Sequence, residues 1–178
     1  MRKGGGKQKG AQFERDVCVM LSKWLTNNVQ VDVFWRSAMS GGRSTVAAKR
    51  TGHLLVNQVG DLSCIDPAGR FFMNTFAVEC KFYRDLDFKG LLTGKGKLLQ
   101  FWDEIRQQAA THGKLPFLVV RQNHMQTFIC VDINGRRKLG LFDRHMTLIS
   151  VKHNMRLIEA DAFVRVCKPY KRERRRLE

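Results

Sequence analysis

Three ionisable residues in the middle of the chain have the types and spacing needed for metal-assisted chemistry. Glu79 and Lys81 lie two residues apart within the apolar stretch 76–82 (FAVECKF), and Asp61 precedes that stretch. Because side chains alternate along a strand, Glu79 and Lys81 share one face. Charged groups in a buried strand are costly unless they are paired or bind a metal ion. The two alternatives are a Glu79–Lys81 salt bridge on an exposed face, or a site to which Asp61 brings a second carboxylate.

The separation of Asp61 from Glu79 constrains the second alternative. Residues 66–69 (DPAG) match a type I turn, with Asp in the first position, Pro in the second and Gly in the fourth. A tight hairpin around this turn would place Asp61 opposite Asn74, five residues short of Glu79. About four extra residues must then be absorbed near residues 71–75, by a bulge or a longer loop.

The elements that must position these residues are predicted from hydrophobic periodicity and turn signals. Apolar residues at helical spacing predict helices over 11–26 and 97–112, and Trp24, Trp35 and Trp102 are expected in the core. Strands are predicted within 29–35, 54–65, 76–82, 116–120 and 127–131. Asn134-Gly135 favours a hairpin turn, and residues 138–167 are expected to add a strand or two and a short helix. The order α-β-β-β-α-β-β predicts an α/β fold with a mixed sheet flanked by helices.

The charge of the chain favours a polyanionic partner, with nucleic acid ahead of a membrane surface. The 178 residues contain 32 Lys and Arg against 16 Asp and Glu, which gives a formal net charge of +16. The ends 1–10 and 165–178 together hold eleven basic and two acidic residues, and the segment between them holds 21 basic and 14 acidic. We therefore divide the chain into a flexible basic arm (1–10), one folded domain (11–167) and a basic tail (168–178). The alternative is that the basic arm and the basic tail only increase solubility or direct targeting.

Composition excludes several classes of protein. No apolar run is long enough to span a bilayer, and the N-terminus lacks the apolar segment of a secretory signal. The five cysteines form no CxxC pair, which argues against a zinc ribbon or a disulfide framework and favours a reducing, cytoplasmic setting. The segment 90–96 (GLLTGKG) lacks the spacing of a Walker phosphate loop.

The charged residues resemble a known motif. Gly60-Asp61 followed by Glu79-Cys80-Lys81 resembles the PD-(D/E)xK nuclease motif, with Gly60 in place of the usual proline. Glu14 resembles the first-helix glutamate of many such nucleases. The segment 36–42 (RSAMSGG) is similar to the Arg–Ser–Gly segment of archaeal-type Holliday junction resolvases. The resemblance covers about residues 9–131 and implies a restriction-endonuclease-like core.

The resemblance implies a role for each residue of the motif. Asp61 and Glu79 would bind Mg²⁺, with the backbone carbonyl of Cys80 as a third ligand, and Mn²⁺ is expected to substitute. Glu14 would act behind these ligands or on a second metal ion. Lys81 would orient the attacking water and stabilise the charge on phosphorus. The side chain of Cys80 should point into the core, because thiolates prefer softer metals.

The expected activity is Mg²⁺-dependent hydrolysis of DNA by a structure-selective endonuclease of prokaryotic or phage origin. A homodimer fits the resemblance, because resolvases of this type act as dimers. The alternatives are a restriction or nicking endonuclease on duplex DNA, and a non-catalytic nucleic-acid-binding protein. Candidate DNA contacts are basic or polar residues of the loop, one strand end and the tail: Arg36, Ser40, Arg43, Lys49, Arg50, Arg121, Lys171, Arg172, Arg174, Arg175 and Arg176.

Overall fold

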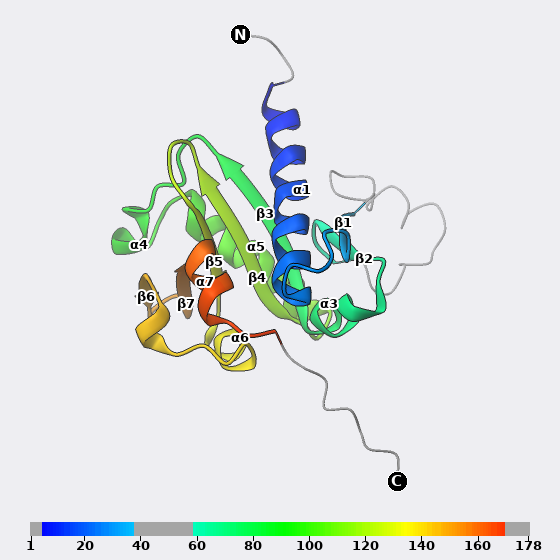
Figure 1. Cartoon of the computed structure of the whole chain (residues 1–178). Coiled ribbons are helices and arrows are strands. Elements are labelled where there is room, and N and C mark those ends of the chain that lie inside the picture. Colours follow the sequence, from blue (N-terminus) through cyan, green and yellow to red (C-terminus); the bar gives the residue numbers. More distant parts are fainter. Residues whose placement is uncertain (1–4, 38–58, 170–178) are drawn as a thin grey trace.

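A mixed sheet with helices on both faces forms the body of the protein. The computed structural model describes residues 5–37 and 59–169 (Figure 1). Its strands are β1 (Phe34–Arg36), β2 (Leu62–Cys64), β3 (Phe76–Tyr83), β4 (Leu115–Gln122), β5 (Thr127–Val131), β6 (Leu148–Ser150) and β7 (Met155–Glu159). Its helices are α1 (Gly5–Thr26), α3 (Arg70–Thr75), α4 (Gly90–Thr93), α5 (Lys97–Thr111), α6 (Ile133–Lys138) and α7 (Ala160–Val166), with single 3-10 turns at Pro67–Gly69 and Asp143–His145. The predicted α/β class and mixed sheet are confirmed.

The sheet leaves one side of β3 unpaired along most of its length. Five strands are arranged in the order β3-β4-β5-β7-β6, and β1 pairs with β2 in a separate antiparallel ribbon. β3 and β4 are parallel because α5 carries the chain back between them, whereas the other pairs are antiparallel. Gly60 forms an isolated parallel bridge with Val78 on the free side of β3. The ribbon is thereby attached beside the strand that carries Glu79 and Lys81.

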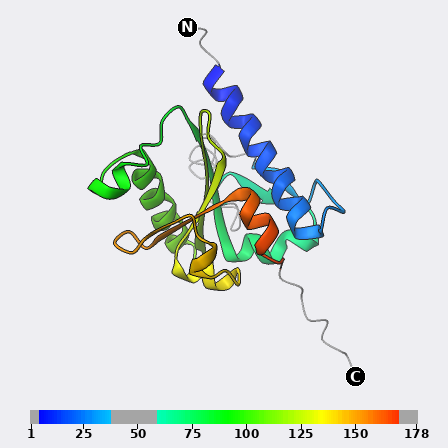
Figure 2. The same cartoon turned by 60° about the vertical axis from the view of Figure 1, so that its left-hand side comes forward.

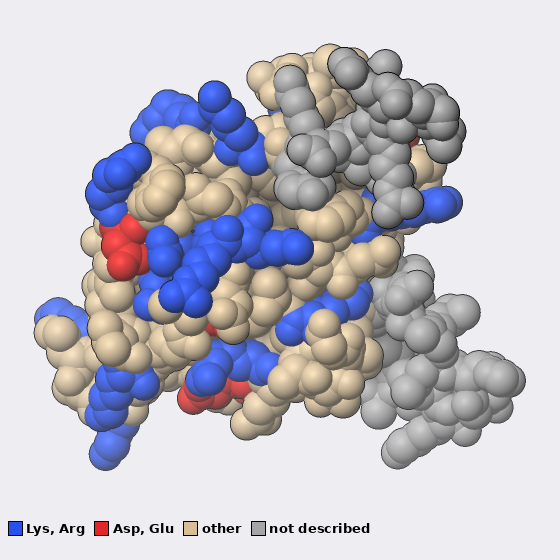
Figure 3. Space-filling view, turned by 90° about the horizontal axis from the view of Figure 1, so that it is seen from below, with Lys and Arg blue, Asp and Glu red and all other residues tan. Residues whose placement is uncertain are grey.

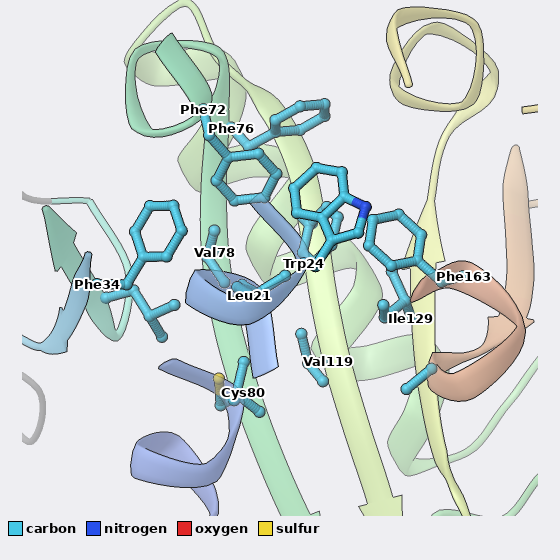
Figure 4. Close-up of a cluster of buried hydrophobic side chains, with 14 of the residues drawn as sticks. Leu21, Trp24, Phe34, Phe72, Phe76, Val78, Cys80, Val119, Ile129 and Phe163 are labelled. Atoms are coloured by element: carbon cyan, nitrogen blue, oxygen red, sulfur yellow. The ribbon is translucent and has the colours of Figure 1, made fainter. Parts of the chain in front are cut away.

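Helices cover both faces of the sheet (Figure 2), and two apolar clusters hold them there. On one face, α1 and α7 pack on Val78, Cys80 and Val119, and Figure 4 shows Leu21, Trp24 and Phe163 in this cluster. On the other face, α5 packs on Ala77, Leu118 and Val120. Since residues alternate along β3, the side chains of Val78 and Cys80 enter the α1 cluster, whereas residue 79 belongs to the face that α5 covers. Among the described residues, no helix is long and apolar enough to cross a membrane.

The first helix and first strand have different bounds from those predicted. α1 begins at Gly5, so residues 5–10, which the sequence assigned to a flexible arm, are helical. Glycine costs a helix only about 1 kcal/mol, and the lysines and glutamine that follow Gly6 are good helix formers. The strand predicted over 29–35 shrinks to β1, because Asn27 and Asn28 turn with positive φ, and Val29 and Val31 stay exposed.

Of the two turn predictions, the one at residues 66–69 is confirmed and the one at residues 134–135 failed. Asn134-Gly135 does not form a hairpin turn but lies in α6, since the Asp132 carboxylate accepts from the backbone N–H of Gly135 and caps that helix. The basic residues 136–138 therefore end a helix rather than a hairpin tip. At residues 66–69 the predicted turn forms as a single 3-10 turn, in which the Gly69 N–H donates to the Asp66 carbonyl at 3.1 Å and the Asp66 carboxylate accepts from the Ala68 N–H.

The remaining element predictions are mostly confirmed. α5, β3, β4 and β5 match their predicted positions to within two residues, and the chain after residue 138 adds β6, β7 and α7. β2 covers only the end of the strand predicted within 54–65, of which residues 54–58 lie outside the described part. Trp24 and Trp102 are buried as expected, whereas Trp35 is 56% exposed, so its assignment to the core was wrong.

Candidate active site

Asp61 is attached to β3 by two hydrogen bonds. Its backbone N–H donates to the Val78 carbonyl at 2.8 Å, and its side-chain Oδ2 accepts from the Cys80 N–H at 2.8 Å. Gly60 allows this approach for two reasons. Its φ is +90°, which glycine adopts readily, and it lacks the Cβ that would otherwise lie 2.0 Å from the Val78 oxygen. The Asp61 carboxylate is therefore held beside the Glu-x-Lys segment.

Both alternatives raised by the sequence apply to Glu79 and Lys81. Lys81 Nζ donates to Glu79 Oε1 at 2.5 Å, so the salt bridge exists. It is not on an exposed face, however, because the two side chains retain only 19% and 27% exposure and lie next to Asp61. The pair is thus part of a half-buried cluster at the edge of the sheet.

The pairing between β2 and β3 differs from the hairpin considered from the sequence. The residues between them form the 3-10 turn and α3, and the bridge at Gly60 is parallel rather than antiparallel. The extra residues near 71–75 thus become a helix instead of a bulge. A tight turn would make the two segments antiparallel. The helix instead returns the chain so that residues 60–61 run parallel to residues 78–79, and Asp61 comes into register with Glu79.

Glu14 approaches the cluster from the helix on the opposite face. Its carboxylate accepts a hydrogen bond from Arg36 Nε, and the side chain is only 13% exposed. Glu14 also contributes to the electrostatic field on Asp61. The structure therefore brings Glu14, Asp61, Glu79 and Lys81 together, while Arg36, predicted as a DNA contact, forms an ion pair with Glu14.

The pKa of Asp61 reflects this crowding. Burial, followed by the Glu79 and Glu14 carboxylates, raises the pKa of the carboxyl to about 7, although the Cys80 N–H and Lys81 oppose the rise. A cation bound beside Asp61 would relieve this repulsion and favour the ionised carboxylate.

This shift predicts how the stability of the metal-free protein depends on pH. The native state holds the Asp61 proton up to about pH 7, whereas the unfolded chain loses it near pH 4. The native state therefore binds more protons within this window, and the free energy of unfolding falls as pH rises through it. We expect Asp61→Asn to remove about 2–3 kcal/mol of this decline, or about 5–10 °C of Tm between pH 5 and 7.5, in melting curves recorded with a chelator. An unchanged pH slope in Asp61→Asn would contradict the assignment.

The side chain of Cys80 takes no part in the charged cluster. It is buried in the α1 cluster, as Figure 4 shows, and burial, followed by the nearby Asp61 carboxylate, raises the pKa of its thiol well above the ordinary value. A neutral buried thiol does not bind Mg²⁺, in agreement with the sequence prediction. Only the backbone of Cys80 faces the site.

Lys81 is a cation in this structure. Burial lowers the pKa of its amine, but the carboxylates of Glu79, Asp61 and Glu104 have the larger combined effect and raise it overall. Its ammonium also lies 5.2 Å from the centre of the Phe101 ring. Lys97, which was not predicted from the sequence as a site residue, places its ammonium 5.5 Å from the same ring centre. Its position four residues before Phe101, in the first turn of α5, was the available signal.

The donor set fits a hard divalent cation that keeps part of its water shell. Among the described residues, no three His, Cys, Asp or Glu side chains form a cluster able to hold a metal ion. The site instead offers the carboxylates of Asp61 and Glu79, and the Cys80 carbonyl lies on the strand between them. Mg²⁺ is commonly held by one or two carboxylates plus waters and substrate phosphates, so a third side chain is not required.

Most predicted DNA contacts lie outside the described residues, namely Ser40, Arg43, Lys49, Arg50, Lys171, Arg172, Arg174, Arg175 and Arg176. Arg121 is described: it is exposed on β4, and its guanidinium lies 5.6 Å from the Phe82 ring centre, beside Lys81 in sequence.

Figure 3 shows Lys and Arg side chains over the lower face of the molecule, with few acids among them. α6 lies at this end of the molecule in Figure 1, and Arg137 and Lys138 in its last turn are exposed, whereas Arg136 pairs with Asp143.

Comparison with protein families agrees with this geometry. The model of the family described as "Phage putative PDDEXK endonuclease" matches residues 5–167, which includes every described element that carries the cluster. No curated protein and no solved structure matches the chain significantly. The superfamily expected from the motif is thus confirmed, whereas the likeness to Holliday junction resolvases stays a prediction. The chain belongs to the phage PDDEXK endonuclease family.

Proposed function

We propose that this protein is a divalent-metal-dependent endonuclease that hydrolyses DNA at the Asp61–Glu79–Lys81 cluster, with Mg²⁺ as the natural ion and Mn²⁺ as a substitute. The observation that carries the proposal is the double attachment of Asp61 to β3, which places a second carboxylate beside the Glu-x-Lys pair. A protein that only holds phosphate has little reason to gather carboxylates within a chain of net charge +16.

The chemistry follows from the groups present. Water adds to phosphorus while the bond to the leaving sugar oxygen breaks, which yields a phosphate monoester and a hydroxyl. A bound divalent cation supplies an activated water and neutralises phosphate charge. Asp61, Glu79 and the Cys80 carbonyl would hold that cation. The Lys81 ammonium orients the water and stabilises the negative charge that develops on the phosphoryl oxygens.

The proposal is tested by incubating the protein with a four-way junction, a linear duplex and a single strand, each with Mg²⁺ and with EDTA. Cutting in Mg²⁺ alone, fastest on the junction, is expected. Equal cutting of the linear duplex would favour a restriction or nicking enzyme. Binding of all three without cutting, in Mg²⁺ or Mn²⁺, would identify a non-catalytic binding protein and refute the proposal.

We further propose that a homodimer acts on branched DNA, because resolving a junction requires two cuts. Sedimentation of the protein with and without a junction tests the homodimer. A protein that stays monomeric on the junction and still cuts it would contradict the proposal. All five cysteines are free thiols in the structure, and this supports a cytoplasmic site of action.

The basic tail is proposed to strengthen DNA binding without reading sequence. Deleting residues 170–178 removes five basic residues, and we expect about tenfold weaker binding at 0.1 M salt with a shallower dependence of log Kd on log salt. Cleavage at saturating protein should be unchanged. The control is a tail of equal length with these residues replaced by glutamine. If the glutamine tail binds as tightly as the natural tail, the charge is not the cause.

A further inference from the structure

Trp35 is an exposed indole next to the candidate active site. Its side chain is 56% exposed, whereas Trp24 and Trp102 are 6% and 0% exposed. Its neighbour Phe34 is buried against Phe72, so consecutive residues of β1 face opposite ways. An indole left in water gives up the burial that normally stabilises this side chain, which makes its position informative.

Backbone pairing fixes Trp35 relative to Asp61. Trp35 is in register with Ser63, whose hydroxyl donates to the Trp35 carbonyl at 3.3 Å. Two residues on, the Ser37 N–H donates to the Asp61 carbonyl at 2.7 Å. Ser63 is two residues from Asp61, a step of about 7 Å along a strand, so Trp35 is separated from Asp61 by about the spacing of one or two nucleotides.

The surroundings of Trp35 combine apolar and cationic groups. It lines a surface groove of about 400 Å³, together with the exposed Val19 and Val31 and the basic Arg15 and Arg36. Asp32 is the acidic residue in the lining. Arg36 also contacts Glu14, so one residue of the groove lining is shared with the charged cluster. A flat apolar surface edged by cations and next to a phosphate-cutting site fits a nucleobase and its phosphates.

We propose that Trp35 stacks on an unpaired DNA base within one or two nucleotides of the phosphate that is cut. The proposal rests on the proposed function for the position of that phosphate. Bases within a duplex already have both faces covered by their neighbours, so an indole can stack only on a base that is unpaired or displaced. Trp35 would thereby select DNA with a single-stranded segment beside the cleavage point, and this selection would not depend on sequence.

The test measures binding in EDTA, so that no DNA is cut. Three probes are used: a single strand carrying 2-aminopurine, a duplex with a four-nucleotide gap carrying 2-aminopurine in the gap, and a fully paired duplex with a fluorescent end label. Trp35→Ala should bind the first two about tenfold more weakly and bind the paired duplex within about twofold of the wild type. Trp35→Phe, which keeps a ring, should retain most of the affinity. The wild type should quench 2-aminopurine, and Trp35→Ala should not.

Phe142→Ala provides the matched control, because Phe142 is 53% exposed and lies on a different part of the chain. It should bind all three probes as the wild type does. Equal losses on paired and unpaired DNA, or no loss on either, would overturn the proposal. So would a Trp35→Ala protein that binds DNA normally but no longer self-associates in sedimentation, because Trp35 would then contact a second copy.

The outcome is separable from that of the proposed function. If the protein cuts no DNA yet Trp35→Ala loses affinity for unpaired bases, catalysis is refuted and base stacking stands. If the wild type cuts DNA and Trp35→Ala cuts gapped and paired substrates at an unchanged ratio, base stacking is refuted and catalysis stands.

Discussion

Replacing Glu79 with Gln, or Lys81 with Ala, is expected to lower the rate of DNA cleavage by about a thousandfold, while the Kd for DNA changes by less than about threefold. Glu79→Gln removes the charge that would hold a divalent cation. Lys81→Ala removes the ammonium that neutralises charge on phosphorus. Binding should survive because the basic residues that attract phosphate are elsewhere. Single-turnover cleavage of a labelled junction, with binding measured in EDTA, separates the two quantities.

Matched substitutions away from the cluster control for nonspecific effects. Glu159→Gln changes a partly buried glutamate at the end of β7, three strands away from β3, and Lys89→Ala changes an exposed lysine before α4. Both should cleave at the wild-type rate. If Glu79→Gln and Lys81→Ala cleave as fast as these controls, the catalytic residues lie elsewhere.

Gly60 is expected to be nearly as sensitive, although it has no side chain. Gly60→Ala places a Cβ 2.0 Å from the Val78 oxygen at a φ of +90°, so the ribbon must move away from β3. Because a displacement of about 1 Å in an active site costs about 100-fold in rate, we expect at least that loss. Gly60→Pro restores the usual residue of the motif, yet it should lose as much, since proline holds φ near −65°.

Gly113→Ala separates backbone strain from displacement of the site. Gly113 has a φ of +63° after α5, and a Cβ there meets nothing within 4 Å. The substitution should lower the free energy of unfolding by about 1 kcal/mol and leave cleavage intact. Comparing melting curves and rates of the variants shows whether Gly60 acts through Asp61. A Gly60→Pro protein with wild-type activity would contradict the attachment described above.

Periodicity predicted the central elements because α5 buries one regular face and β3 to β5 are buried on both faces. Apolar residues of α5 recur at helical spacing, and β3 to β5 are short apolar runs in a sheet covered on both sides. Local signals were less reliable where a side chain competed for the backbone. The Asp132 cap places the apparent hairpin turn within α6. Two asparagines with positive φ, Asn27 and Asn28, delay the start of β1 to Phe34. Trp35 could not be placed from sequence, because an alternating pattern does not reveal whether the outer face of a two-stranded ribbon is covered.

The cluster was predicted by residue type, but its geometry was not. The motif indicated Glu14, Asp61, Glu79 and Lys81, and the structure brings all four together. The path from Asp61 to Glu79 was unpredictable because it depends on α3, a six-residue helix without a strong sequence signal. The parallel bridge at Gly60 depends in turn on that helix. The ion pair of Arg36 with Glu14 links residues 22 positions apart, and only the folded chain reveals it.

The most direct test of the account is Mn²⁺ binding measured by the loss of the free-ion signal in electron paramagnetic resonance. The wild type, Asp61→Asn, Glu79→Gln and Glu159→Gln are titrated under identical conditions. The account predicts that the wild type and Glu159→Gln bind Mn²⁺ equally, and that Asp61→Asn and Glu79→Gln each bind at least tenfold more weakly. Equal binding by all four proteins would show that the carboxylates at the edge of β3 do not hold the metal ion.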